Sequence, residues 1–225
     1  MKYALTLAVV VALSSCEAPG YRGAQERVIR PGEVASFDVL YAQNCSACHG
    51  AKGEGALTVG IGSPVYLAIA EDSTIRDTIR KGRRGTPMSA FAQSEGGMLT
   101  DAQIEILVRG IRQRGGPALI ADNPPPYAAT QPGGTAHGRQ VFTESCARCH
   151  GAGNFADPSY LSLVTDQHLR TVIIVGMPNL GMPDWRGYSK PLSDAEITDV
   201  AAWLADLRSV AYPQRGPSFS AQVKN

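Results

Sequence analysis

Cys45-Ser46-Ala47-Cys48-His49 is the stretch of this 225-residue chain that decides its fold. Two thiols flank two small residues, and an imidazole follows directly. In a helix, residues three positions apart lie on the same face, so both sulfurs can reach one neighbouring group. The arrangement recurs at Cys146-Ala147-Arg148-Cys149-His150. Together the two copies use four of the five cysteines and two of the four histidines.

A Cys-x-x-Cys-His pattern is typical of covalent haem attachment. The two sulfurs can form thioether bonds to the two vinyl groups of one porphyrin, and the histidine can bind the iron as its proximal ligand. The sequence therefore predicts two covalently attached haem c groups. A zinc site or a dithiol redox motif is the alternative, but neither needs a histidine directly after both cysteine pairs. The predicted attachment and ligand residues are Cys45, Cys48, His49, Cys146, Cys149 and His150.

The composition excludes some classes of protein. The formal net charge is +1, so no basic surface for nucleic acid is indicated. With 24 glycines, 15 prolines and few aromatic residues, the chain has little apolar mass for two small cores. A covalently bound porphyrin would supply the missing apolar volume.

The first 33 residues are predicted to target and tether the chain. Lys2 precedes an apolar run from Tyr3 to Leu13, which is too short to span a bilayer as a helix. Leu13-Ser14-Ser15-Cys16 resembles the lipobox of bacterial lipoproteins. This resemblance implies a signal peptide over 1–15, a lipid on Cys16 and a tether over 16–33, with the chain exported, lipid-anchored and facing the periplasm. An ordinary signal peptide or an uncleaved anchor is the alternative.

An internal repeat relates the two halves of the chain. Tyr41 and Phe142 each stand four residues before the first cysteine of a motif, an offset of 101 residues. From Pro64 to Phe91 the offset to the second half is a constant 94 residues. The first half therefore has a longer loop after its histidine, and the two halves are predicted to be alike.

Helical spacing defines the two predicted domains. Apolar residues recur at helical intervals over 36–44 and 74–81, and Thr100 is the predicted N-cap of a third helix. The stretch around Pro124-Pro125-Pro126 has no such spacing and is predicted to be a semi-rigid linker. The predicted segments are domain 1 over 34–114, the linker over 115–133, domain 2 over 134–212 and a disordered tail over 213–225.

Each half resembles a class I cytochrome c, with a helix that runs into Cys-x-x-Cys-His, a Pro-containing loop, a methionine in a later loop and a C-terminal helix. The tandem arrangement resembles dihaem cytochromes of the c4 type. The resemblance implies an all-α fold of two tandem cytochrome c-like domains, each around one covalently bound haem c. It also implies that the carbonyls of Pro64 and Pro158 accept a hydrogen bond from the proximal histidines.

In such cytochromes a methionine thioether is the second axial ligand and raises the reduction potential. Met88 and Met182 occupy equivalent positions in the repeat, whereas the counterpart of Met177 is Arg83, which cannot bind iron. Met88 and Met182 are therefore the predicted ligands, with Met98 and Met177 as the other candidates. The alternative is that these methionines fill gaps in the core.

Two histidines lie outside the motifs. His137 is in the Gly-rich approach to the second domain, and His168 is on a predicted helix. Both are expected to be exposed rather than bound to metal. Ligation of the second iron by His168 is the alternative.

Basic residues cluster just before Met88 in the first half. Positive charge beside the haem edge would attract an acidic redox partner. The second half has apolar residues in the equivalent loop, which favours an apolar contact there. The alternative is an ordinary solvated run of charge. The cluster consists of Arg80, Lys81, Arg83 and Arg84.

The resemblance implies an electron carrier rather than an enzyme. It implies a membrane-anchored dihaem cytochrome that passes single electrons in a respiratory or other membrane electron-transport chain, alone or as a subunit of a larger complex. Its implied partners are redox proteins or a membrane respiratory complex. A haem enzyme, such as a peroxidase or a sulfur-compound dehydrogenase, is the alternative and requires an iron with an open position. A sensory haem module is a third possibility.

Overall fold

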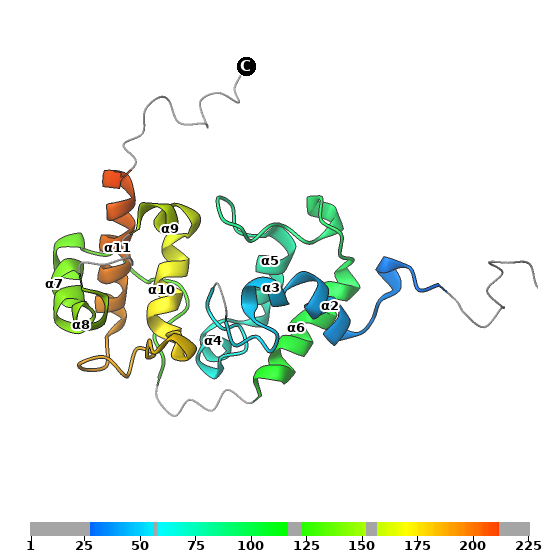
Figure 1. Cartoon of the computed structure of the whole chain (residues 1–225), viewed down its shortest axis with the longest axis horizontal. Helices are drawn as coiled ribbons and strands as arrows, with labels where there is room; N and C mark the ends of the chain where they lie inside the picture. The colour runs from blue at the N-terminus through cyan, green and yellow to red at the C-terminus, as the bar shows by residue number, and fades with distance from the viewer. Residues whose placement is uncertain (1–27, 56–57, 117–122, 152–156, 212–225) are drawn as a thin grey trace, which may run out of the picture. The chain divides into compact units, whose positions relative to one another are not determined.

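The computed structural model describes residues 28–55, 58–116, 123–151 and 157–211 (Figure 1). Regular structure in these ranges is helical, apart from isolated β-bridges that pair Ala92 with Leu99 and Met177 with Met182. The predicted all-α fold is therefore confirmed. The predicted signal peptide, Cys16 and the tail over 213–225 lie outside the described residues.

The described residues before Val34 belong to a unit separate from the described residues that follow. They include the 3-10 helix η1 (Pro31–Glu33), and the amide of Arg30, just before this helix, donates to the Glu33 carboxylate at 3.1 Å. Two apolar side chains that precede it, Val28 and Ile29, are exposed.

The helices of residues 34–225 fall into two runs of the same order. The first run is α2 (Phe37–Asn44), α3 (Ser46–His49), α4 (Pro64–Ile69), α5 (Asp72–Lys81) and α6 (Asp101–Gly115). The second run is α7 (Thr135–Ser145), α8 (Ala147–His150), α9 (Pro158–Leu163), α10 (Asp166–Val175) and α11 (Asp194–Ala211). The 3-10 helices η2 (Gln93–Glu95) and η4 (Pro178–Leu180) precede the last helix of each run. The helices predicted over 36–44 and 74–81 are confirmed as α2 and α5.

Hydroxyl side chains begin the long helices of both halves. The Thr100 hydroxyl oxygen accepts a hydrogen bond from the Gln103 backbone N–H at 3.3 Å, and the Gln103 side-chain oxygen accepts one from the Thr100 backbone N–H at 3.0 Å. The predicted N-cap is therefore confirmed as part of a capping box. Ser193 and Glu196 make the same reciprocal pair at the start of α11. These local signals fix where the last helix of each half starts.

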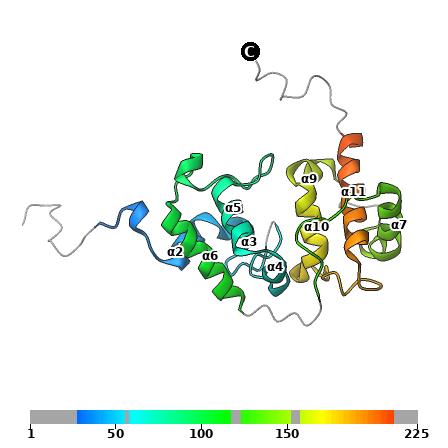
Figure 2. The same cartoon turned by 180° about the vertical axis from the view of Figure 1, so that it is seen from behind.

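The first and last helices of each half pack on each other (Figure 1, Figure 2). α2 packs on α6, and α7 packs on α11. A Cβ atom on Gly110 of α6 would lie 2.0 Å from the Phe37 ring of α2. In the second half the glycine is on the first helix instead, and a Cβ atom on Gly138 would lie 2.0 Å from the Asp199 carbonyl oxygen. Both crossings are thus too close for any side chain at the glycine.

The close contact is made by different residues in the two halves. In the repeat, Phe37 corresponds to Gly138, and Gly110 corresponds to Trp203. In the first half the Phe37 ring lies against Gly110, whereas in the second half Gly138 faces the Asp199 backbone. Trp203 packs instead against Phe142, with 4.8 Å between ring centroids.

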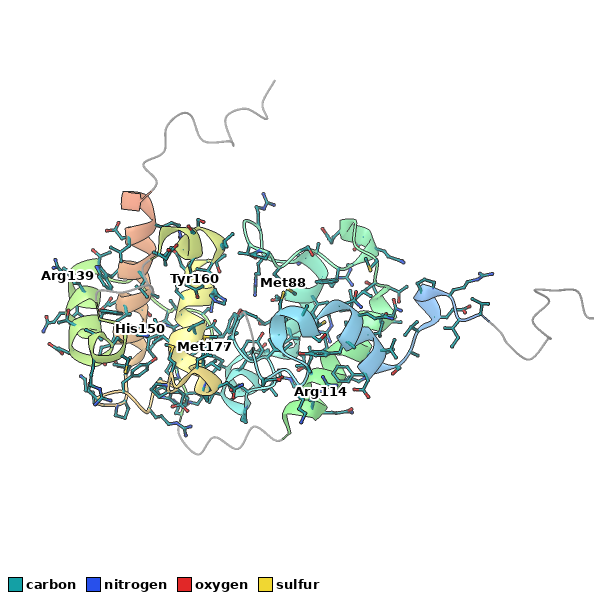
Figure 3. The ribbon with its side chains drawn as sticks, viewed as in Figure 1. Met88, Arg114, Arg139, His150, Tyr160 and Met177 are labelled. Atoms are coloured by element: carbon teal, nitrogen blue, oxygen red, sulfur yellow. The ribbon has the colours of Figure 1, made fainter. Side chains whose placement is uncertain are left out.

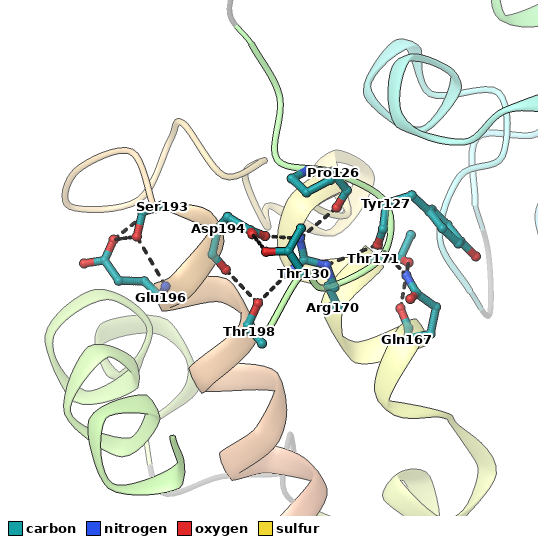
Figure 4. Close-up of polar contacts among 10 residues, drawn as sticks. All are labelled: Pro126, Tyr127, Thr130, Gln167, Arg170, Thr171, Ser193, Asp194, Glu196 and Thr198. Atoms are coloured by element: carbon teal, nitrogen blue, oxygen red, sulfur yellow. Dashed lines mark hydrogen bonds and ion pairs between the residues drawn. The ribbon is translucent and has the colours of Figure 1, made fainter. Parts of the chain in front are cut away.

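A buried arginine holds the end of the linker against the second half (Figure 4). The Arg170 side chain on α10 is only 3% exposed, so its charge requires several acceptors. Its acceptors are the carbonyl oxygens of Pro126 (2.7 Å) and Tyr127 (3.1 Å), the Thr198 hydroxyl (2.8 Å) and the Asp194 carboxylate. The counterpart in the first half, Arg76, is 34% exposed and pairs with Glu105. Part of the predicted linker is therefore packed onto the second half.

Gly138→Ala is expected to lower the free energy of unfolding by about 2 kcal/mol, because the added methyl group meets backbone atoms that cannot move aside. Gly134→Ala is the matched control, since it adds a methyl group at the start of the same helix, where the nearest atom is 3.7 Å away. The control should cost about 0.5 kcal/mol. Urea unfolding followed by circular dichroism measures both variants. A Gly138→Ala variant as stable as the control would contradict the close crossing.

Candidate haem sites

Each Cys-x-x-Cys-His motif begins at a bend between two helices. Cys45 joins α2 to α3 with φ −124° and ψ −37°, and Cys146 joins α7 to α8 with φ −118° and ψ −32°. The His49 amide donates to the Cys45 carbonyl at 3.0 Å, and the His150 amide donates to the Cys146 carbonyl at 3.1 Å. The two motifs therefore share one local backbone, a single helical turn that carries both thiols and ends at the histidine.

The two thiols of each motif differ in burial. Cys45 is half-buried and Cys146 is buried, whereas Cys48 and Cys149 are exposed. Burial raises the pKa of the Cys45 and Cys146 thiols to about 11, so both are protonated at neutral pH. One sulfur of each pair thus lies against the protein and the other lies at its edge. This arrangement suits a porphyrin that is attached through two neighbouring vinyl groups.

The histidine of the first motif is held in its neutral form. His49 is half-buried, and burial lowers the pKa of its imidazole, which favours the form that binds metal. Its Nδ1 atom is fully buried, and no described residue hydrogen-bonds to it. A metal-bound histidine normally donates its second ring N–H to a carbonyl or carboxylate. The Nε2 atom of His49 could bind a metal, but the acceptor that would orient the ring through Nδ1 is not in place among the described residues.

The predicted acceptors for the histidines are the carbonyls of Pro64 and Pro158. These prolines are the first residues of α4 and α9. A proline at this position is favoured because the first amides of a helix have no intrahelical partner. In this structure the His49 Nδ1 makes no hydrogen bond to the Pro64 carbonyl, so that predicted bond is not formed. The bond from His150 to the Pro158 carbonyl stays a prediction.

Polar contacts hold the chain just after His49. The buried Tyr41 hydroxyl donates to the Gly50 carbonyl at 2.9 Å, and burial raises the pKa of Tyr41 to about 12, so the hydroxyl keeps its proton. Arg114 stacks 4.5 Å over the Tyr41 ring centroid and donates to the Ala51 carbonyl at 3.1 Å. Arg114 was not among the predicted site residues. It lies 63 residues from Ala51 in sequence, and only the fold brings the two together.

Aromatic rings replace these polar contacts in the second half. Phe142 occupies the position of Tyr41, and its ring centroid is 6.2 Å from that of His150. Trp203 packs on the same phenyl ring. The two motifs therefore share one backbone, but the tyrosine hydroxyl beside the first is replaced by a phenyl ring beside the second.

Both predicted methionine ligands lie in tight loops that follow a glycine. Gly82 and Gly176 follow α5 and α10 with φ +64° and +70°, in the region that favours glycine. A Cβ atom on Gly82 would lie 2.5 Å from the Met88 carbonyl oxygen. The Arg83 amide donates to that oxygen at 2.7 Å, so the loop closes on itself.

The two methionines of the first half differ in burial; Figure 3 labels Met88, in the loop after α5. Met98 is 70% exposed, whereas Met88 is half-buried, which favours Met88 as the residue that faces a bound group. Met177 and Met182 are both half-buried and exchange two backbone hydrogen bonds of 2.9 and 3.2 Å. In the second half burial does not distinguish the two methionines, and Met182 is favoured as the ligand because it occupies the position of Met88 in the repeat.

The two remaining histidines differ from each other. His137 is exposed, as predicted, with its Nδ1 2.7 Å from the Asp199 carboxylate. His168 is half-buried, so the prediction that it is exposed is wrong. It lies on α10 with its Nε2 3.4 Å from the Tyr160 hydroxyl, and burial lowers its pKa to about 4.

The donor atoms fit two haem groups better than a zinc site. Among the described residues, no group of three or more His, Cys, Asp or Glu side chains is placed to hold a metal ion. Each half instead supplies two thiols on one helical turn, an imidazole and a half-buried thioether. This is the donor set of a covalently attached haem with two axial ligands.

Two of the four residues in the basic cluster have acidic partners. Paired carboxylates reduce the charge that a distant partner senses. Arg83 is half-buried and Arg84 is exposed, so the positive charge beside the methionine loop is centred on these two residues. The ion pairs are Arg80 with Asp101 and Lys81 with Asp77, the second at 3.0 Å.

The family model for cytochrome c oxidase, cbb3-type, subunit III matches residues 32–109 and 133–204. Cbb3-type cytochrome c oxidase subunit CcoP of Azospirillum sp. (strain B510) is 32% identical over 199 residues, and CcoP of Azospirillum brasilense is 28% identical over 194 residues. Each alignment covers 74% of this chain, which spans 60% and 59% of the lengths of these two relatives.

Other similarities cover different shares of the chain. Cytochrome c6 of Synechocystis sp. (strain ATCC 27184 / PCC 6803 / Kazusa) is 30% identical over 106 residues, which are 45% of this chain and 78% of that protein. A chain of the Kuenenia stuttgartiensis reducing HAO-like protein complex has a TM-score of 0.43 and 17% identity, covering 80% of this chain and 99% of that chain. A structural similarity of this size carries no functional argument.

Replacement of Met88 by alanine is expected to remove the long-wavelength absorption band of one Met-ligated ferric haem, because the exposed Met98 is not placed to substitute for it. Met98→Ala is the control and should leave the band intact. Absorption spectra of the oxidised protein test both variants. A band lost with Met98 and kept without Met88 would reverse the assignment.

Proposed function

Since the chain belongs to the cytochrome c family described as cytochrome c oxidase, cbb3-type, subunit III, we propose that it carries single electrons through two covalently attached haem c groups. The observation that carries this proposal is the repeated helical turn with two thiols and a terminal histidine, once in each half. A bound haem c supplies an iron that takes up and releases one electron. The protein's contribution is to attach the group, complete its axial ligation and tune its potential.

The proposed ligand set follows from the donor chemistry and the repeat. In each half, the two cysteines would hold the porphyrin, and the histidine and the methionine would hold the iron. A soft thioether favours ferrous iron, which suits a carrier of high potential. With both ligands bound, the iron would be closed to a substrate, so the chain is proposed to be an electron carrier rather than an enzyme. The proposed iron ligands are His49, Met88, His150 and Met182.

We further propose that the chain is held at a membrane by a lipid on Cys16, exported and facing the periplasm. Among the described residues, none of the helices has the length and apolar character needed to cross a membrane. Covalent haem attachment requires export, and acyl chains on an N-terminal cysteine would keep the chain at the membrane surface. Membrane fractionation of a Cys16→Ser variant tests the anchor, which a variant still bound to membranes would contradict.

The proposed partners are redox proteins or a membrane respiratory complex. Two relatives are named as subunits of a cbb3-type cytochrome c oxidase, which supports a place in a respiratory chain. The tandem arrangement within one chain supports the dihaem c4-type architecture, with one haem in each half. The chain would serve either as a free carrier or as a subunit of a larger complex.

Haem counting tests the central proposal. The wild-type chain is expected to carry two covalent haems, and the double variants Cys45→Ala/Cys48→Ala and Cys146→Ala/Cys149→Ala are expected to carry one each. Pyridine haemochrome spectra and haem staining on denaturing gels measure the number. Carbon monoxide should not bind to the reduced wild type at neutral pH. Binding to one haem would instead support the haem-enzyme alternative.

An acidic redox partner is proposed to dock beside the methionine loop of the first half. Arg83→Glu/Arg84→Glu is expected to slow electron transfer to such a partner at low salt and to flatten its dependence on ionic strength, because steering by charge is screened by salt. Lys81→Glu is the control, since Lys81 is already paired with Asp77. Stopped-flow kinetics over a range of salt concentrations measures both. Equal effects of the two variants would contradict docking at this loop.

A further inference from the structure

One arginine on the last helix of each half makes the same set of contacts. The acceptors of Arg112 on α6 are the carbonyl oxygens of Leu67 and Ala70 and, at 2.5 Å, the carboxylate of Asp72. The acceptors of Arg208 on α11 are the carbonyl oxygens of Leu161 (2.8 Å) and Val164 (3.0 Å) and the carboxylate of Asp166 (2.9 Å). The acceptors correspond one to one in the repeat, at a constant offset of 94 residues.

The two arginines themselves do not correspond. α6 and α11 are related by an offset of 93 residues, so Ala205 is the counterpart of Arg112, and Gly115 is the counterpart of Arg208. A Cβ atom on Gly115 would lie 2.1 Å from Leu67 Cδ1 and 2.9 Å from a backbone oxygen, so the first half cannot use that position. The same three acceptors are therefore reached from positions one helical turn apart. This indicates that the contact is required, whichever position supplies it.

The chemistry of the acceptors explains why an arginine is used. The last carbonyls of a helix have no intrahelical partner, and a cation is favoured at that end. Leu67 and Ala70 lie at the end of α4, and Asp72 is the first residue of α5. The planar guanidinium has five donors and can bind all three groups at once, which the single ammonium of a lysine cannot do with the same geometry. One side chain thus closes the corner between two helices in each half.

The corner joins the chain that follows His49 to the chain that leads to Met88. α4 starts at Pro64, after the loop that follows His49, and α5 leads into the loop of Met88. The Phe91 amide donates to the Ile79 carbonyl at 3.0 Å, so the loop returns onto α5 and moves with it. A shift at the corner would therefore move the Met88 loop relative to α4.

We propose that Arg112 and Arg208 are positioning residues that hold the two axial ligands of each haem at the separation that iron requires. The proposal rests on the proposed function, because it assumes a His/Met-ligated haem in each half. Both arginines bind carbonyl oxygens and a carboxylate of the corner rather than a proposed iron ligand. Each acts through the backbone of the corner that it closes.

The test uses the full-length protein with its haems attached. Arg112→Ala and Arg208→Ala are each expected to lose the share of the ferric Met-ligation band that comes from one haem, to shift one of the two reduction potentials and to bind carbon monoxide at one reduced haem. Combination with Met88→Ala identifies which haem is affected. Arg112→Ala should cause no further loss of the band in that background, whereas Arg208→Ala should remove what is left.

Because Arg112 and Arg208 occupy positions one helical turn apart in the repeat, the second half can be given an arginine at the position that the first half uses. Ala205→Arg in the Arg208→Ala background places the guanidinium of the second half where the first half has it. This double variant is expected to regain the band and the original potential. Arg109→Ala is the control, because it removes the same charge from an exposed position of α6. Thermal unfolding of every variant shows whether the loss of the band accompanies loss of the fold.

Two results would overturn the proposal. One is that neither arginine variant changes the band, the potentials or carbon monoxide binding. The other is that Ala205→Arg restores none of the properties lost in Arg208→Ala, including its folding if that variant fails to fold. A wild-type protein that lacks the Met-ligation band would contradict the proposed ligand set instead. The two failures are therefore distinguishable.

Discussion

The bend at the first cysteine of each motif is the constraint on which the rest of the structure depends. Cys45 and Cys146 have nearly the same backbone angles, and each starts a single turn that ends at a histidine. The turn can hold a rigid macrocycle only if the helix before it is fixed, because both thiols and the imidazole must face one group. The crossing of that helix with the last helix of the same half provides this fixed support.

Each half meets the same geometric requirements with different residues. At the helix crossing, the glycine is on the last helix of the first half, α6, but on the first helix of the second half, α7. At the corner between the third and fourth helices of each half, the guanidinium comes from positions one turn apart. Close packing requires that the helices meet at the same places in both halves, but it does not require that the same position supplies the side chain that makes the contact.

The residues beside the two motifs differ although their backbones agree. A tyrosine hydroxyl and the Arg114 guanidinium lie beside the first motif, whereas Phe142 and Trp203 lie beside the second. Hydrogen bonding and burial around a haem are the means by which a protein sets its reduction potential. If each half holds a haem as proposed, these differences would give the two haems different potentials.

Local pattern in the sequence determined the motifs, the helical class, the caps and the correspondence of the two halves. These features depend on residues within a few positions of one another or on direct repetition, so one sequence is enough to find them. Only the tertiary structure showed that Arg114 reaches the first motif, that Arg170 is buried under the linker, that His168 is half-buried, and that Met88 rather than Met98 is shielded from solvent. These contacts join residues tens of positions apart. Their partners depend on how the helices cross, which no local pattern records.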